Sequence, residues 1–220
     1  MRALTAMSLP SLAADPPDDR ARSAVRHAAL HIARADQMAV LDELEEVHRQ
    51  FGSAVVRLSG EGARELCPAL RVGPEHCHAA LLHREALKLD ADAMLQGALR
   101  DLRANGGELV PRARVTAIRR DGALWRVKSG VGDFAAHRIV NAAGAWADDI
   151  AALAGAPQIG IEPRRRTVVS FAGPPETDVS RWPFVKTVGA GFYLLPEGRG
   201  ALLASPMDQS PSAPCDAAPE

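Results

Sequence analysis

Long apolar runs, aromatic residues and an excess of charge of either sign are all scarce in this sequence. No apolar run approaches the roughly 18 residues of a transmembrane helix, so we expect no membrane span. The 26 basic and 27 acidic residues leave a formal net charge of −1, which gives no electrostatic reason for a nucleic acid or an anionic membrane as partner. The 220 residues can bury a sizeable core, and small-molecule chemistry is the expectation.

Cysteine is equally scarce. Cys67, Cys77 and Cys215 form an odd, widely spaced set without a C-x-x-C pair, which is typical of reduced thiols in a cytoplasmic protein. The first two are more typical of buried small apolar side chains than of nucleophiles. A signal peptide is not expected, because Ser8 and Pro10 interrupt the first apolar stretch.

Histidine clusters do not indicate a metal centre. His76 and His78, with His83 nearby, have a spacing that fits few zinc patterns, and no carboxylate or thiolate set completes it. We therefore expect no metal ligand in this chain.

The apolar pattern predicts a mixture of helices and strands. A strand is expected at 29–33, followed by a helix that Asp36 caps. A second helix begins after Asp90 and ends at 105–107. Turn residues then separate three strand-like stretches, which predict a β-meander: 114–119, 123–128 and 134–141. Further strands of an antiparallel sheet are expected at 167–171, 191–195 and 200–204.

The most informative stretch is 139–150, where a short β-branched run passes through Ala142, Ala143 and Gly144 into a helix. Such small residues let backbone amides at a helix start approach a bulky anionic ligand, for which a phosphate-bearing cofactor is the natural candidate. A turn packed tightly against its own sheet explains the same composition equally well.

This turn, Asn141 to Trp146, resembles the motif that closes the flavin domain in the D-amino-acid oxidase and dehydrogenase family of FAD enzymes. The helix after it ends in Leu153-Ala154-Gly155, as it does in that family. Other segments that resemble the family are 89–97, 160–167 and 192–196. The resemblance covers essentially residues 25 to 215 and is nearest to the D-arginine dehydrogenase type.

The resemblance implies an α/β plus antiparallel β fold. A partial FAD-binding lobe, made of a helix, the β-meander and a closing strand and helix, would be interleaved with a mostly antiparallel substrate-binding sheet. The corresponding segments are a poorly ordered lead-in at 1–24, a first substrate-lobe segment at 25–88, the partial FAD-binding lobe at 89–156 and a second substrate-lobe segment at 157–220.

The resemblance also assigns roles to individual residues. Arg166, the last of three arginines, would grip the carboxylate of an amino-acid substrate, for which its planar fork suits a bidentate pair. Tyr193, the only tyrosine, would direct its hydroxyl to the same carboxylate. A charged strand edge and a half-buried aromatic are the competing interpretations. The residues expected to contact FAD are Val115, Asn141, Ala142, Ala143, Gly144 and Trp146.

One part of the family pattern is missing. The G-x-G-x-x-G turn that holds the FAD pyrophosphate does not occur; 130–135 spells G-x-G-x-x-A, but it lies between two strands with no helix behind it, so we interpret it as a turn. We expect an enzyme truncated at both ends, with a complementary chain as one source of the missing unit. A glycine- or sarcosine-type amine oxidase and a non-catalytic fragment are the alternatives.

Overall fold

The computed structural model describes residues 2–14 and 23–217. The chain divides into two compact units, one made of residues 1–98 and 166–208 and the other of residues 99–165 and 209–220. Because the chain leaves the first unit and returns to it, its sheet is built from two separate stretches of sequence. These boundaries differ from the segments expected from the sequence: 157–165 and 209–217 belong with the meander, and the assignment of the units to substrate and FAD lobes stays a prediction.

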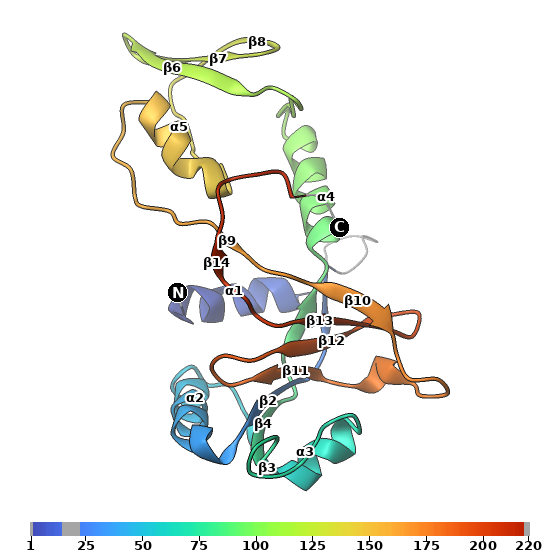
Figure 1. The fold of residues 1–220 in the computed structure, drawn as a ribbon. Coiled ribbons are helices and arrows are strands. Elements are labelled where there is room, and N and C mark those ends of the chain that lie inside the picture. The colour runs from blue at the N-terminus through green and yellow to red at the C-terminus, as the bar shows by residue number, and fades with distance from the viewer. Residues whose placement is uncertain (1, 15–22, 218–220) are drawn as a thin grey trace. The chain divides into compact units, whose positions relative to one another are not determined.

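The first unit contains a seven-stranded sheet in the order β10-β13-β12-β11-β2-β4-β3 (Figure 1). Only β11 and β2 pair in parallel, so the expected mostly antiparallel sheet is confirmed. The strands are β2 (Ala29–Ala33), β3 (Val56–Ser59), β4 (Ala79–His83), β10 (Val169–Ala172), β11 (Phe184–Thr187), β12 (Tyr193–Gly198) and β13 (Ala201–Ser205). A separate pair joins β1 (Ala24–Arg26) to β5 (Leu87–Leu89).

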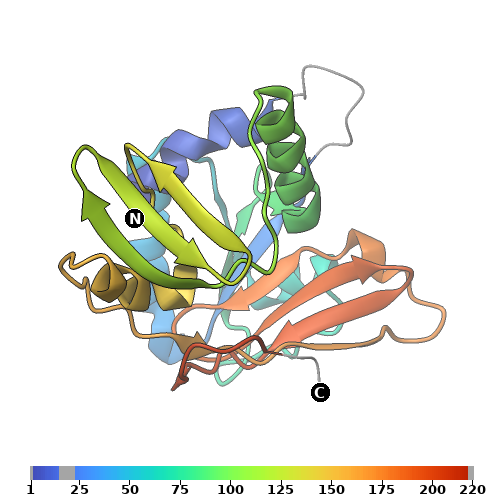
Figure 2. The same cartoon turned by 90° about the horizontal axis from the view of Figure 1, so that it is seen from above.

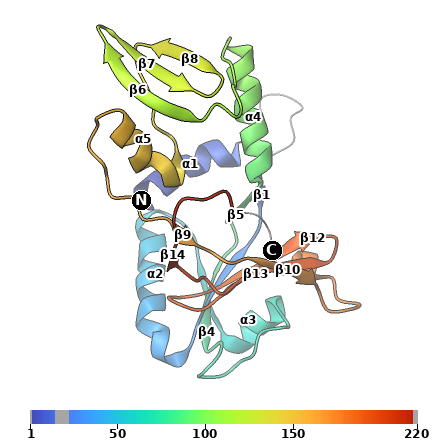
Figure 3. The ribbon, with the colours of Figure 1, turned by 45° about the horizontal axis from the view of Figure 1, so that its top comes forward.

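Helices cover both faces of the sheet. On one face, Leu30 and Ile32 of β2 pack with Ala63 of α3 (Gly60–Leu66) and with residues around a 3₁₀ turn, η3 (Val179–Arg181). On the other face, Leu81 of β4 packs with Leu41 of α2 (Met38–Gln50). Figures 1 and 3 show α2 and α3 on either side of β4. Alternate residues of β2 and β4 therefore face α2 or α3.

The second unit contains the β-meander that the sequence predicts. Its strands β6 (Val115–Asp121), β7 (Leu124–Ser129) and β8 (Gly132–Ala136) pair antiparallel in sequence order and lie side by side (Figure 2). They are followed by a 3₁₀ turn, η2 (Gly144–Trp146), by α5 (Ala147–Leu153), which packs against β6, and by a short pair between β9 (Arg164–Arg165) and β14 (Ser210–Pro211).

The meander prediction is wrong at its end. The expected strand at 134–141 ends at Ala136, and Ile139 and Val140 belong to an irregular segment in which Val140 is 88% exposed. A β-branched pair becomes a strand only where a neighbouring strand accepts its backbone hydrogen bonds. The described part of the second unit offers none at this position.

The helix predictions have two outcomes. α4 (Ala91–Ala104) begins as expected, because the Asp90 carboxylate accepts a hydrogen bond of 2.9 Å from the Ala93 amide. Asp36 does not cap α2: it lies in a 3₁₀ turn, η1 (Ala35–Gln37), and accepts hydrogen bonds from the Arg34 guanidinium instead.

Near the N-terminus the structure has a helix, α1 (Arg2–Ala13), within the stretch expected to be a poorly ordered lead-in. Residues 15–22 of that stretch lie outside the described residues. No helix in the described part of the chain is long and apolar enough to cross a membrane.

Candidate functional site

The turn before α5 is held in shape by Asn141. Its side-chain amide donates a hydrogen bond of 2.8 Å to the Ala147 carbonyl, and its side-chain oxygen accepts one of 3.2 Å from the Ala143 amide. Both polar ends of the Asn141 side chain are therefore used inside the turn. Any contact of this turn with a cofactor falls to the backbone around it and to its small side chains.

Gly144 requires its glycine for conformational reasons. Its φ of +54° lies in the left-handed region, where a Cβ is unfavourable. Among the described residues, no atom outside Gly144 and its two chain neighbours lies within 4 Å of the position that a Cβ would take. The turn is therefore open above Gly144 and is not packed against its own sheet there. A flat or anionic group can approach the backbone at this point, which fits a phosphate-bearing cofactor.

Asp148, in the first turn of α5, ties this helix to the segment that follows it. Its carboxylate accepts hydrogen bonds from three successive backbone amides, those of Ile159, Gly160 and Ile161, at 2.9, 2.9 and 2.8 Å. These amides, that of Ile159 most strongly, lower the pKa of the Asp148 carboxyl. The residue thus fixes the path of the chain from α5 towards β9.

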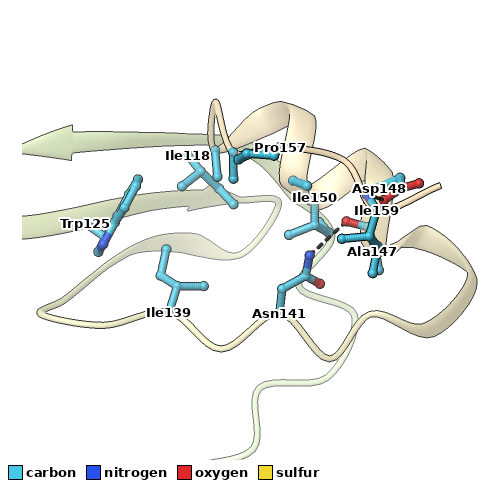
Figure 4. A pocket seen from close by; sticks show the side chains of 12 residues that line it. Ile118, Trp125, Ile139, Asn141, Ala147, Asp148, Ile150, Pro157 and Ile159 are labelled. Atoms are coloured by element: carbon cyan, nitrogen blue, oxygen red, sulfur yellow. Dashed lines mark hydrogen bonds between the residues drawn. The ribbon is translucent and has the colours of Figure 1, made fainter. Parts of the chain in front are cut away.

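An apolar cavity of about 330 Å³ lies in the second unit (Figure 4). Ile118 and Trp125 of the meander line one side, and Ile150 of α5 and Ile159 line another. Asn141 lies at its edge, where the dashed line in Figure 4 marks its bond to Ala147. The cavity is lined by residues of both the meander and the turn before α5. These two segments, which the sequence predicts to contact a cofactor, therefore belong to the same structural unit.

Replacing Asp148 by asparagine is expected to destabilise the second unit, because a neutral amide accepts weaker hydrogen bonds than a carboxylate. The carboxyl pKa is lowered in the folded state, so its contribution is present above the pKa of the unfolded chain, about 4. It is lost as the pH falls through the lowered folded-state value. Urea unfolding between about pH 2 and pH 7 should show a smaller pH dependence for Asp148→Asn than for the parent protein. The exposed neighbour, in Asp149→Asn, is the matched control; equal losses in both variants would contradict the role of Asp148.

Arg166 is exposed and directly precedes Thr167, which is anchored to Asp208. The Asp208 carboxylate accepts hydrogen bonds from the Thr167 amide at 2.7 Å and from its hydroxyl at 2.8 Å. These two bonds, with a smaller effect of the Arg166 charge, lower the pKa of Asp208. Asp208 therefore fixes the backbone that carries Arg166 and places a negative charge near its guanidinium.

Tyr193 is the first residue of β12, in the same unit as Arg166. It lies opposite Ser205 of β13, and β13 pairs in turn with β10, which begins three residues after Arg166. The Tyr193 side chain is half-buried, with its ring 5.6 Å from that of Phe184. Arg166 therefore precedes β10 at the same end of the sheet at which Tyr193 begins β12.

A row of polar side chains continues from Tyr193 across this sheet. β11 lies between β12 and β2, and its Lys186 is opposite Tyr193 on one side and His31 on the other. Residues opposite each other in neighbouring strands point to the same face. Since His31 alternates with Leu30 and Ile32, which face α3, this row faces α2.

Three imidazoles gather on this face. The His48 ring on α2 lies 6.2 Å from that of His31 and 5.0 Å from that of His83. Burial first, and then the nearby charges of His48, Lys186 and His83, lowers the pKa of His31 to about 4. His31 is therefore neutral at neutral pH, and its buried Nδ1 atom has no hydrogen-bond partner in the described ranges.

The cysteines behave as expected from the sequence. Cys67 and Cys77 are buried in the core on the α3 side, all three cysteines are free, and burial raises the pKa of both buried thiols to about 11. These thiols are not activated nucleophiles. Within residues 2–14 and 23–217, no group of three metal-binding side chains comes together.

Comparison with protein families decides what kind of protein this is. The family model described as DAO, FAD dependent oxidoreductase, matches residues 19–219. The chain belongs to the FAD-dependent oxidoreductase family. FAD is thus the cofactor of its family, and the open turn at Gly144 is compatible with that group.

Several solved structures share the fold. L-proline dehydrogenase from P. horikoshii superposes with a TM-score of 0.73 at 19% identity, covering 92% of this chain and 54% of that one. Glycine oxidase from Geobacillus kaustophilus gives 0.68 at 22% identity, with 96% and 55% covered. L-alpha-glycerophosphate oxidase from Mycoplasma pneumoniae, with FAD bound, gives 0.72 at 20% identity, with 83% and 50% covered. The chain spans about half the length of each of these three proteins.

The structure brings together some of the site residues that the sequence predicts. Asn141 to Trp146 form one turn, and Val115 begins β6, the strand against which α5 packs. Arg166 and Tyr193 share the other unit. The sequence reasoning missed Asp148, Asp208 and Lys186. Asp208 follows the strand at 201–205 by three residues, a signal that could have been noticed; the partners of Asp148 and Lys186 are visible only in the folded chain.

Proposed function

We propose that this chain is part of an enzyme that oxidises the Cα–N bond of D-amino acids to imino acids. The observation that carries the proposal is the placement of exposed Arg166 and half-buried Tyr193 on one end of the sheet in the first unit. A guanidinium and a phenol are both suited to bind a carboxylate. Membership of the FAD-dependent oxidoreductase family supports redox chemistry on the molecule that they hold.

Each residue then has a defined task. Arg166 pairs with the substrate carboxylate through its planar fork, and Asp208 keeps the backbone at Thr167 in place. Tyr193 donates its hydroxyl hydrogen to the same carboxylate and so fixes the orientation of the α-carbon. When bound, FAD supplies the hydride acceptor. Hydrolysis of the imino acid in water needs no further group from this chain.

The cofactor side of the proposal rests on the turn at 141–146. Ala142, Ala143 and Gly144 offer small side chains and accessible backbone, while Asn141 holds the turn and Trp146 is 37% exposed beside it. Val115 would meet the adenine end of FAD through its backbone. These are proposed contacts, supported by the open space above Gly144.

The exposed apolar residues of the second unit support a further, complementary part. Leu102 of α4, Leu109, Val140 and Ile159 are 40%, 47%, 88% and 76% exposed. In the part of the chain that the structure describes, no strand pairs with the β-branched residues Ile139 and Val140. A strand-turn-helix unit carrying G-x-G-x-x-G, from a complementary chain or from a longer form of this one, would cover apolar side chains of this kind and complete the FAD site.

The substrate assignment has one close competitor. A glycine- or sarcosine-type amine oxidase is favoured by the similarity to glycine oxidase from Geobacillus kaustophilus. The D-arginine dehydrogenase type is a narrower alternative, which the positive charge of Lys186 opposite Tyr193 disfavours. A cytoplasmic location fits the three free cysteines and is part of the same proposal.

Anaerobic flavin reduction tests the proposal. The FAD-loaded enzyme is mixed with D-alanine, D-methionine, L-alanine, glycine or sarcosine, and flavin bleaching is followed at its visible absorbance maximum. We expect the D-enantiomers to reduce the flavin and L-alanine to leave it oxidised. Faster reduction by glycine or sarcosine than by either D-amino acid would favour the amine-oxidase alternative, and reduction by L-alanine alone would contradict D-specificity.

A further inference from the structure

The polar row beside Tyr193 lines a second cavity, within the first unit. This cavity measures about 200 Å³ and lies between α2 and β11, with His31, Lys186 and Glu43 among its lining residues. Lys186 is half-buried and directly opposite Tyr193 in the register. A group held by the Tyr193 hydroxyl therefore has this cavity as its neighbour on the same face of the sheet.

On the β-sheet side of this cavity, the positive charge of Lys186 has no negatively charged neighbour among the described residues. Within the described ranges Lys186 has no ion-pair partner, and the imidazole next to it, His31, is neutral. The His31 Nδ1 atom is buried with nothing to bond to in the same ranges. Glu43, across the cavity on α2, already makes an interaction of its own. A half-buried lysine side chain and an orphaned ring nitrogen therefore lie on neighbouring strands, and a buried polar atom such as the His31 Nδ1 is expected to have a partner.

We propose that Lys186 and His31 form the subsite for a second, anionic group of the substrate, so that the enzyme acts on amino acids with a distal carboxylate. This inference rests on the proposed function, in which Tyr193 and Arg166 hold the α-carboxylate. Lys186 provides the ion pair, and His31 donates an Nδ1–H hydrogen bond in its neutral form.

The spacing of the sheet agrees with this assignment. Cβ atoms of residues opposite each other in antiparallel strands lie about 4.5–5.5 Å apart, and neighbouring strands are about 4.8 Å apart. The backbones that carry Tyr193 and His31 are thus two strand spacings, about 9.6 Å, apart, which leaves room between the two side chains for a four- or five-carbon dicarboxylate. A ligand with a distal ammonium would instead be placed beside Lys186, where like charges repel.

The test uses three ligands of matched length that differ only in the distal group: glutarate, glutaramate and 5-aminopentanoate. They carry a negative, a neutral and a positive distal group, and none depends on the D or L configuration. Binding to the 220-residue chain is followed through the NMR signals of the histidine imidazoles. We expect glutarate to bind on the order of tenfold more tightly than glutaramate, as for a half-buried ion pair.

Four variants separate the possible results. Lys186→Met should abolish the preference for glutarate while leaving glutaramate binding unchanged, and Lys186→Arg should retain the preference. Lys128→Met, which removes an exposed lysine of the second unit, is the matched control and should change nothing. Arg166→Met should weaken all three ligands equally, because it removes the shared carboxylate contact.

The two proposals fail in different ways. Equal affinities for glutarate and glutaramate, or a higher affinity for 5-aminopentanoate, overturn the anionic subsite. If binding is still weakened by Arg166→Met, the proposed function is retained. Independence from Arg166 overturns the proposed carboxylate clamp, and with it the inference that depends on it. If none of the three ligands binds saturably, both the proposed function and the anionic subsite are overturned.

Discussion

Replacing Arg166 by methionine is expected to lower kcat/KM of the FAD-loaded enzyme for amino acids while leaving its FAD content unchanged. Methionine keeps an unbranched side chain but loses the fork that pairs with a carboxylate. Losing one partner of such a pair costs about 2–5 kcal/mol, or roughly thirtyfold to several thousandfold in kcat/KM. The lower end applies if the guanidinium stays as exposed as it is in this chain.

The natural control lies two residues earlier. Arg164 pairs with Glu162 and donates to the Gln209 carbonyl, within the second unit. Arg164→Met removes the same charge from the same basic run without touching the proposed carboxylate site. Equal kcat/KM for the Arg166 variant and the parent would make Arg166 an ordinary surface residue.

The isolated 220-residue chain is expected to bind FAD weakly, even though its family depends on this cofactor. The turn at 141–146 supplies one approach to the cofactor, but the sequence has no G-x-G-x-x-G turn for the pyrophosphate. Two missing charge-assisted hydrogen bonds at about 1.5–3 kcal/mol each correspond to roughly 10²- to 10⁴-fold in affinity.

Titration of the purified chain with FAD, followed by flavin fluorescence, measures this affinity. A second titration, with a strand-turn-helix polypeptide carrying G-x-G-x-x-G added in excess, tests whether the missing unit restores binding. Stoichiometric binding by the chain alone, with a resolved flavin spectrum, would contradict the expectation.

Local sequence signals predicted the parts of this fold that depend on local physics. Asp90 caps α4 because a carboxylate and an amide three residues on meet in any helix start, and the meander follows its turn residues. The prediction that Ile139 and Val140 lie in a strand is wrong, because strand formation depends on non-local pairing. Their strand needs a neighbour, and no local pattern reveals whether a neighbour is present.

The candidate site likewise contains residues that local sequence signals predict and residues that only the folded structure reveals. Residue types and a family resemblance pointed to Arg166, Tyr193 and the turn at Gly144. Lys186 gave no signal, because its position opposite both Tyr193 and His31 depends on the pairing of β11 with strands on either side of it. Asp148 likewise shows its importance only through three amides that lie 11 to 13 positions further along the chain.

The parallel pairing of β2 with β11 has a consequence for how the protein folds. Residues 99–165 of the second unit lie between these two central strands in the sequence, and the Gln37 side chain near β2 bonds to the Val188 carbonyl, 151 positions away. Forming contacts between residues so far apart in the sequence requires a large loss of loop-closure entropy before the contacts can stabilise the fold. During synthesis, β2, β3 and β4 emerge with β2 as a bare edge that must wait for β11. The interval in which that edge is exposed is when this chain is most open to wrong strand pairing.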